Sequence, residues 1–234
     1  TGGSMARAHA EGHRVVLVVA TGGEYGEVPE DLADGETLAD RRRAETERSA
    51  VVLGVDRIVW LGYTDSGMTG WEQNSHDGAF VAAPLDEAAA RFAALLDEED
   101  ADIAVGYDWH GGYGHPDHVR VHEVLHRAVA LAARPPRVLE STMNRDAMRR
   151  LAAGARAAGA TDDEVFGPDQ PMDDGNPLGE PESAIHWRVD VGAWLDERLV
   201  PPVLALADEA GLANGAPVRP FSWQEPDGGY RAFW

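Results

Sequence analysis

Residues 14–27 read RVVLVVATGGEYGE, in which six apolar residues follow Arg14 and a glycine-rich polar loop follows them. An apolar run of this length, without polar alternation, is typical of a strand that is buried on both faces of a parallel sheet. The loop Thr21–Glu27 would then lie at the carboxyl end of the strand, where open α/β sheets bind their ligands. This stretch therefore predicts a class of fold and the edge of the sheet that should carry a site.

Strand-like and helix-like segments alternate after this stretch. Short apolar runs predict further strands at 56–61, 102–107 and 137–141. Segments with apolar residues on one side predict helices at 37–53, 87–96 and 117–133, after a helix end at 4–10. Alternation at this spacing indicates βαβ units. We therefore expect an α/β fold, a Rossmann-like three-layer sandwich with a mostly parallel sheet.

The remainder of the chain is less regular. Residues 159–183 are rich in Asp, Pro and Gly and predict an irregular surface insertion. A late strand is expected at 184–191 and a helix at 194–213, ahead of an aromatic, turn-rich tail at 216–234. Because no linker separates two apolar cores, we expect a single domain.

The composition excludes several kinds of site. The 234 residues include no cysteine, and all 20 basic residues are arginine. A thiol nucleophile, a disulfide, a cysteine-ligated metal, a lysine Schiff base and a P-loop lysine are therefore excluded. The formal net charge of −21 argues against a nucleic-acid partner or binding to an anionic membrane surface. We interpret the acidity as favouring solubility, with adaptation to high salt and attraction of an amine substrate as alternatives.

The sequence carries few signals for the location of the protein or for its oligomeric state. No run approaches the roughly 18 apolar residues of a membrane helix, so membrane insertion is not expected. The lack of cysteine fits a cytoplasmic protein, and the sequence leaves open whether the chain forms a homo-oligomer.

Polar loops follow the predicted strand ends, and one of them is rich in histidine. Five of the nine histidines lie within 17 residues: His110, His115, His118, His122 and His126. Pro116 and Asp117 are typical of a first helical turn, so His115 and His118 should lie near a helix start at the end of a strand. This pattern fits a capped helix with surface histidines or a metal and acid–base site. Since His122 and His126 lie one and two turns further on, we interpret them as ordinary helix residues.

The residues alone give an incomplete metal site. A catalytic zinc needs three protein ligands and an open position for water. His118 supplies one ligand, and no residue near it in sequence clearly supplies the others. A dinucleotide-binding protein is disfavoured, because no Gly-x-Gly-x-x-Gly motif opens a helix after a strand.

The run GGYGHPDH at 111–118 resembles the second signature of the LmbE-like (PIG-L) zinc-dependent de-N-acetylases, a family that includes the mycothiol-pathway deacetylase. Other matching segments occur in the family's order: TGGEYGE at 21–27, RRAE at 42–45 with LGV at 53–55, and WLGYTDSGM at 60–68. The likeness covers residues 1–141 and implies one LmbE-like deacetylase domain over 1–234. The insertion 159–183 and the C-terminal part 184–234 are variable.

The resemblance implies roles for residues of the histidine loop. His118 would be the third zinc ligand, and zinc would activate a water and polarise an amide carbonyl. His115 would stabilise the oxyanion and protonate the leaving amine, while Asp117 would orient His115. Tyr113 would donate a hydrogen bond to the oxyanion, unless it is a packed loop aromatic.

The resemblance also implies substrate-binding residues and further ligands. Arg42 and Asp65 would bind sugar hydroxyls, and Glu24 would hold substrate or support its loop. An ion pair on a helix surface and a turn cap are the alternatives for Arg42 and Asp65. The family's first signature, Ala-His-Pro-Asp-Asp-Glu, is expected upstream of Thr1 with the first strand, two metal ligands and the general base.

We therefore expect a zinc-dependent hydrolase that removes an N-acyl group, with acetyl favoured, from an amino-sugar-containing small molecule. A His and carboxylate site also admits iron and other divalent metals. The alternatives are an S-conjugate amidase of the mycothiol type and a non-catalytic scaffold that lacks part of the metal site.

Overall fold

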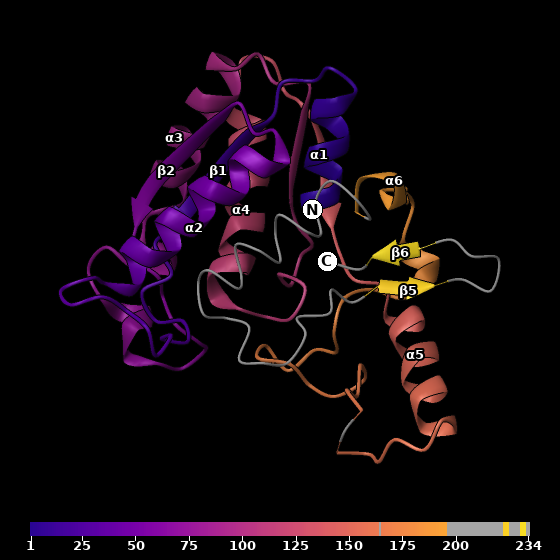
Figure 1. Cartoon of the computed structure of the whole chain (residues 1–234). Helices are drawn as coiled ribbons and strands as arrows, with labels where there is room; N and C mark the ends of the chain where they lie inside the picture. The colour runs from indigo at the N-terminus through magenta and orange to yellow at the C-terminus, as the bar shows by residue number, and fades with distance from the viewer. Residues whose placement is uncertain (164, 196–221, 225–229, 233–234) are drawn as a thin grey trace. The chain divides into compact units, whose positions relative to one another are not determined.

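The computed structural model describes residues 1–163, 165–195, 222–224 and 230–232 (Figure 1). The chain divides into two compact units, one formed by Thr1–Asp65 and Arg188–Trp234 and the other by Ser66–Trp187. Each unit has its own pair of parallel strands and its own helices. The expectation of one domain over the whole chain stays a prediction.

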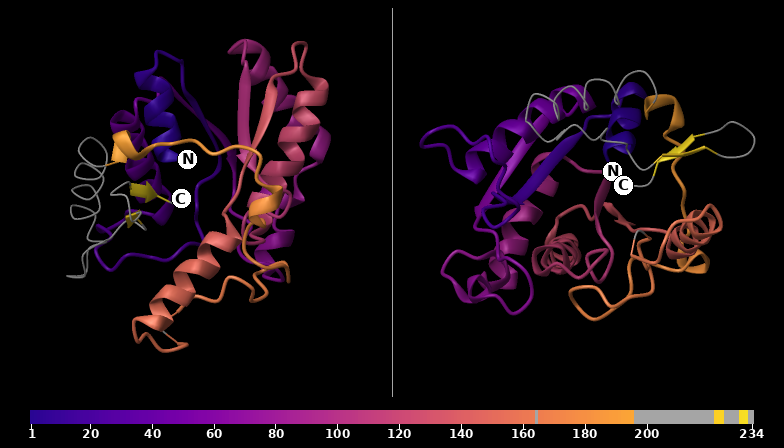
Figure 2. Two further views of the ribbon diagram at one scale, coloured as in Figure 1. Left: turned by 90° about the vertical axis from the view of Figure 1, so that its right-hand side faces the viewer. Right: turned by 60° about the horizontal axis from the view of Figure 1, so that its bottom comes forward.

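The first unit begins with a short helix and contains the strand predicted from the opening apolar run. Its elements are α1 Gly2–Ala10, β1 Val16–Thr21, α2 Leu38–Leu53, β2 Arg57–Tyr63 and α6 Gly192–Leu195. Strands β1 and β2 pair in parallel from Val16 opposite Arg57, with a register shift after Val19. Two further strands, β5 Ser222–Gln224 and β6 Tyr230–Ala232, are antiparallel neighbours (Figure 2).

Helix α2 shows why these residues form this element. The Thr37 side chain accepts a hydrogen bond from the Asp40 amide, and the Asp40 carboxylate accepts one from the Thr37 amide, both at 3.1 Å. This capping box satisfies two amides that the first helical turn leaves without partners. Gly54 ends the helix in the left-handed conformation with φ of 69°, where a side chain would also meet the His9 ring.

The second unit contains the histidine loop. Its longer elements are α3 Leu85–Glu98, β3 Ile103–Tyr107, α4 Pro116–Leu131, β4 Arg137–Ser141 and α5 Arg145–Ala157. It also contains three short 3₁₀ turns: η1 Glu72–Ser75, η2 Phe80–Ala82 and η3 Glu182–Ala184. Strands β3 and β4 are parallel and in register from Ile103 opposite Arg137 to Tyr107 opposite Ser141. This parallel pair is the expected βαβ unit, with α4 as its crossover helix.

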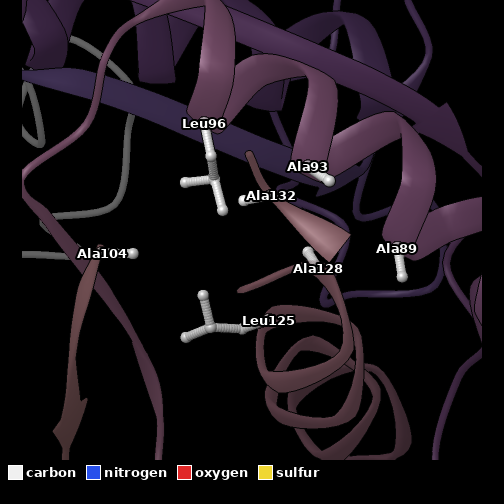
Figure 3. Close-up of a cluster of buried hydrophobic side chains, with 7 residues drawn as sticks. All are labelled: Ala89, Ala93, Leu96, Ala104, Leu125, Ala128 and Ala132. Atoms are coloured by element: carbon white, nitrogen blue, oxygen red, sulfur yellow. The ribbon is translucent and has the colours of Figure 1, made fainter. Parts of the chain in front are cut away.

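A small apolar core joins α3, α4 and β3 (Figure 3). Its buried members are mostly alanines: Ala89, Ala93, Leu96, Ala104, Leu125, Ala128 and Ala132. Small side chains let the two helices approach closely, and the Leu125 side chain, only 1% exposed, fills the space beside Ala104 and Gly106. This core supports the strand that ends at the histidine loop.

The described residues confirm the expected alternation of strands and helices, with shifts of a few residues at their ends. The strand expected at 184–191 is wrong: a 3₁₀ turn ends at Ala184, and the extended residues after it leave Trp187 and Val189 exposed and unpaired in any sheet. Helix α5 was not predicted. Most of the helix expected at 194–213 lies outside the described residues. Among the residues described, no helix has the length and apolar character to cross a bilayer.

Replacing Leu125 by alanine should destabilise the protein by about 3 kcal/mol, because it opens a cavity in the core between α3, α4 and β3. Urea unfolding followed by circular dichroism measures the change. Leu131→Ala is the matched control on the same helix, since that side chain is 42% exposed. Equal losses of stability in the two variants would contradict this description of the core.

Candidate active site

The loop between β3 and α4 is a tight turn that only glycine can form. Gly111, Gly112 and Gly114 have φ angles of 68°, 78° and 86°, in the left-handed region that disfavours residues with a Cβ. The buried Asp108 closes the turn, because its Oδ1 accepts a hydrogen bond of 2.7 Å from the Gly112 amide. The turn thereby carries the chain from the end of β3 into the first residues of α4.

His118 is oriented by this turn. Its Nδ1 lies 3.3 Å from the carbonyl oxygen of Gly111, and its ring stacks on Tyr107 with 4.1 Å between the centroids. A carbonyl oxygen can only accept, so Nδ1 must carry the proton and Nε2 the lone pair that a metal needs. Metal-binding histidines are commonly held in this way by a backbone carbonyl. A Cβ on Gly111 would lie 2.5 Å from the Cβ of His118, so the contact depends on glycine.

His115 has the opposite tautomer. It is the N-cap of α4, and its Nδ1 accepts a 3.1 Å hydrogen bond from the Asp117 amide. The proton of the neutral ring therefore lies on Nε2, which can donate a hydrogen bond to a substrate. The His115 and His118 rings are 4.9 Å apart, and the edge of the Tyr113 ring approaches both, at 6.1 and 5.0 Å respectively. The turn thus brings together the His115 ring, whose Nε2 can donate, the His118 ring, whose Nε2 can accept, and the Tyr113 phenol.

Asp117 is buried, and its Oδ2 accepts a 3.0 Å hydrogen bond from the Ser66 amide. This bond fixes the first turn of α4 to the residue that follows Asp65 in the chain. The orienting bond to His115 comes from the Asp117 backbone amide. The role predicted for the Asp117 carboxylate toward His115 stays a prediction.

The irregular segment 159–183 holds the turn from outside. The Gly179 amide donates to the Gly112 carbonyl at 2.8 Å, and the Asp173 amide donates to the Tyr113 carbonyl at 3.2 Å. At Gly114, a Cβ would collide with the backbone nitrogen of Asp174. The sequence predicted an irregular surface segment here, but not its contact with the histidine loop.

The turn also contains a buried histidine, His110, whose carbonyl accepts a 2.8 Å hydrogen bond from the Gly114 amide. His110 is 1% exposed; its Nε2 is 3.9 Å from Asp108 Oδ1, and its Nδ1 is 3.5 Å from Asp174 Oδ2. Among the described residues, neither ring nitrogen has a hydrogen-bond partner. Burial raises the pKa of Asp174, but hydrogen bonds from Asn176 and the charge of His110 outweigh burial and hold that pKa below its usual value. Two carboxylates thus flank the ring on the side of the turn.

The predicted substrate-binding residues lie in the first unit. Glu24 Oε2 accepts a 2.9 Å hydrogen bond from the Asp65 amide, and Asp65 Oδ2 accepts one of 3.4 Å from the Tyr25 amide. These bonds join the loops that follow β1 and β2. The two roles weighed for Glu24, holding substrate and supporting its loop, stay predictions. Arg42 pairs with Glu45 at 2.9 Å and donates to the Glu27 carbonyl at 3.3 Å, which is the ion pair weighed as its alternative.

A second group of metal-ligating side chains was missed by sequence reasoning. Potential ligand atoms of His122, His126 and Glu140 lie within 4.8 Å of one another. The i, i+4 spacing of the two histidines was a signal for a shared face, but the Glu could be found only from the pairing of β3 with β4. We interpreted both histidines as ordinary helix residues, and the structure brings them to one carboxylate.

Comparison with known proteins gives concordant matches. The family model described as GlcNAc-PI de-N-acetylase (PIG-L) matches residues 1–129, which is more than half of the chain. A 1D-myo-inositol 2-acetamido-2-deoxy-alpha-D-glucopyranoside deacetylase of Thermobifida fusca is 46% identical over 145 residues, covering 58% of this chain and 51% of that protein. The protein of the same name from Saccharomonospora viridis is 36% identical over 204 residues, covering 83% and 74%. The chain therefore spans about half the length of the Thermobifida relative.

The N,N'-diacetylchitobiose deacetylase from Pyrococcus horikoshii is a structural relative with a TM-score of 0.51 and 21% identity. The match covers 100% of this chain and 78% of that chain. Likeness at this level concerns the fold alone, and it confirms the expected Rossmann-like α/β class.

Gly114→Ala should destabilise the protein by at least about 2 kcal/mol, because the positive φ and the collision with Asp174 act together. Thermal unfolding measures the loss. Gly154→Ala in α5 is the control: nothing lies within 4 Å of its added Cβ, so it should be neutral or stabilise by up to about 1 kcal/mol. A Gly114→Ala variant as stable as Gly154→Ala would contradict the described turn.

Asp174 should stabilise the protein more at neutral than at acid pH. Because its pKa is lower in the folded state, its contribution is present above the usual value of 3.8 and is lost as the pH falls through the folded pKa. The difference in Tm between the native protein and Asp174→Asn should therefore shrink from about pH 6 to about pH 3. Calorimetry at both pH values checks this, with the exposed Asp34→Asn as control. A difference that grows toward acid pH would contradict the sign.

Proposed function

The chain belongs to the GlcNAc-PI de-N-acetylase (PIG-L) family, and on that premise we propose that it is a zinc-dependent hydrolase that removes an N-acetyl group from an amino-sugar conjugate. The observation that carries the proposal is the pair of opposite tautomers at the start of α4. The Gly111 carbonyl gives His118 a metal-binding Nε2, and the Asp117 amide gives His115 a donor Nε2 beside it. A metal ligand next to a hydrogen-bond donor is what amide hydrolysis requires.

The substrate class follows from the relatives. Those from Thermobifida fusca and Saccharomonospora viridis carry the name of a deacetylase for N-acetylglucosamine linked to inositol. We propose the same class of substrate for this chain, namely an N-acetylated glucosamine bonded to a polyol. The S-conjugate amidase and the non-catalytic scaffold remain as outcomes that the assay below distinguishes.

The donor set of the histidine loop fits zinc. His118 offers a neutral imidazole nitrogen fixed by a backbone carbonyl, which suits zinc and also other divalent metals. Bound zinc would lower the pKa of a water and polarise the acetamide carbonyl. Further ligands and the general base are assigned by the resemblance to the family's first signature, which residues 1–234 do not contain.

The other residues of the turn act on the substrate. His115 donates a hydrogen bond from Nε2 to the carbonyl oxygen as negative charge develops there. The proton that the leaving nitrogen takes up as the C–N bond breaks would be the one that the general base removes from the attacking water. Tyr113 adds a second hydrogen-bond donor from the same turn. Asp117 acts as a positioning residue, because its backbone fixes the His115 ring and its carboxylate fixes Ser66.

Sugar hydroxyls require fixed donors and acceptors. We propose that the Asp65 carboxylate accepts a hydrogen bond from a sugar hydroxyl, since this buried carboxylate is already held by the Tyr25 amide. Arg42 would bind a hydroxyl oxygen, with Glu45 fixing the guanidinium. Glu24 positions Asp65 through the Asp65 amide. The cytoplasmic location and the oligomeric state stay predictions.

The test is acetate release by the full-length protein loaded with zinc. A panel of N-acetylglucosaminides should include the inositol conjugate, and we expect hydrolysis of at least that compound. His115→Asn should lower kcat by about 100-fold or more with little change in KM, because the lost donor acts mainly in the transition state. His76→Asn, an exposed histidine, is the control.

Three outcomes would contradict the proposal. Release of no acetate from any panel member rules out the deacetylase, and binding without hydrolysis would favour the scaffold. Cleavage of an S-conjugated amide in preference to the acetamides would favour the amidase. A His118→Ala variant that retains activity and zinc affinity would remove the metal role of the turn.

A further inference from the structure

The side chains of His122, His126 and Glu140 form a compact group on the second unit, outside the turn that carries His118. Both histidines come from α4, and Glu140 comes from β4. Glu140 Oε1 lies 2.7 Å from His126 Nε2 and 3.3 Å from His122 Nδ1. The two imidazole rings are 4.4 Å apart. One carboxylate oxygen thus touches both rings.

We propose that His122, His126 and Glu140 form a second divalent-metal site, of a class that takes zinc. Two histidines at i, i+4 on one helix with a carboxylate from a neighbouring element make a His₂Glu set. The two imidazole ligands suit zinc, copper and nickel better than calcium or magnesium, and zinc also accepts a carboxylate. The ligand atoms already lie within 4.8 Å, so a cation would need only side-chain rotations to be bound by all three.

The backbone supports this assignment. His122 Nδ1 lies 3.3 Å from the carbonyl oxygen of Tyr107, the last residue of β3. If Nδ1 donates to this carbonyl, Nε2 carries the lone pair, which is the orienting contact typical of metal-binding histidines. The hydrogen bond between His126 Nε2 and Glu140 would be replaced by one bond from each group to the cation, and the proton of the neutral His126 ring would move to Nδ1.

The surroundings leave room for solvent ligands. The side chains of His122, Glu140 and His126 are 21%, 38% and 48% exposed, so water can occupy the remaining positions. The cation would join α4 to β4 and so stabilise the folded chain in proportion to its affinity. The net charge of −21 favours the approach of cations in general. His118 is not a member of this group of ligands, so the two sites share no ligand.

The experiment is calorimetric titration of the metal-depleted full chain with zinc chloride, together with thermal unfolding. We expect one zinc equivalent to be lost, or its affinity to fall by about tenfold or more, in His126→Ala and in Glu140→Gln. The zinc-induced rise in Tm should shrink in both. His76→Ala should retain this equivalent, and so should His118→Ala, which separates this site from the proposed catalytic ligand.

Several results would overturn the proposal. One is that the native chain binds no zinc. Another is that folded Glu140→Gln binds zinc with the same stoichiometry and affinity as the native chain. Glu140→Gln keeps the size of the side chain, so it tests the carboxylate even if the alanine variant unfolds. Loss of all zinc binding in His118→Ala would assign the zinc to the turn alone. Acetate release should be unchanged in His126→Ala, so the outcome does not depend on the proposed function.

Discussion

The hydrogen bond from His118 Nδ1 to the Gly111 carbonyl is the contact on which the site depends. It exists because three glycines fold the chain back over the start of α4, and because no Cβ separates Gly111 from His118. The same reversal makes His115 the N-cap, so the Asp117 amide chooses the other tautomer for that ring. Backbone geometry therefore gives the two neighbouring imidazole rings opposite tautomers.

The turn is held by one polar contact from within it and by another from a distant part of the chain. Asp108 accepts from the Gly112 amide within the turn, and Gly179 donates to the Gly112 carbonyl from the irregular segment. Within the turn, the buried His110 ring lies 3.9 Å from Asp108 and 3.5 Å from Asp174, and burying an ionisable ring is costly. The position of the turn therefore depends on how the second unit packs around the His110 ring.

Local signals made much of the fold predictable. The apolar run before Thr21 identified β1, and the apolar residues on one side of 37–53 identified α2, because each signal depends on residues close in sequence. Helix α5 was missed although Asn144 caps it, and the strand expected at 184–191 was wrong because local hydrophobicity does not guarantee a pairing partner.

The site was predictable only as far as it is local. The motif identified His115 and His118 by position, but not their tautomers, which depend on three-dimensional contacts of the turn. The support from segment 159–183 and the meeting of His122 with Glu140 both follow from tertiary structure. The alternation of strands and helices predicted a parallel neighbour for β3, but no pattern in the sequence specifies which loops or side chains touch one another.

The tautomers of His115 and His118 can be measured in solution. Long-range ¹H–¹⁵N correlation NMR of the metal-free chain distinguishes Nδ1–H from Nε2–H at about pH 8, where histidine is ordinarily neutral. The structure predicts the proton on Nδ1 of His118 and on Nε2 of His115. A His118 ring that carries its proton on Nε2 would show that the Gly111 carbonyl does not orient it and would contradict the account.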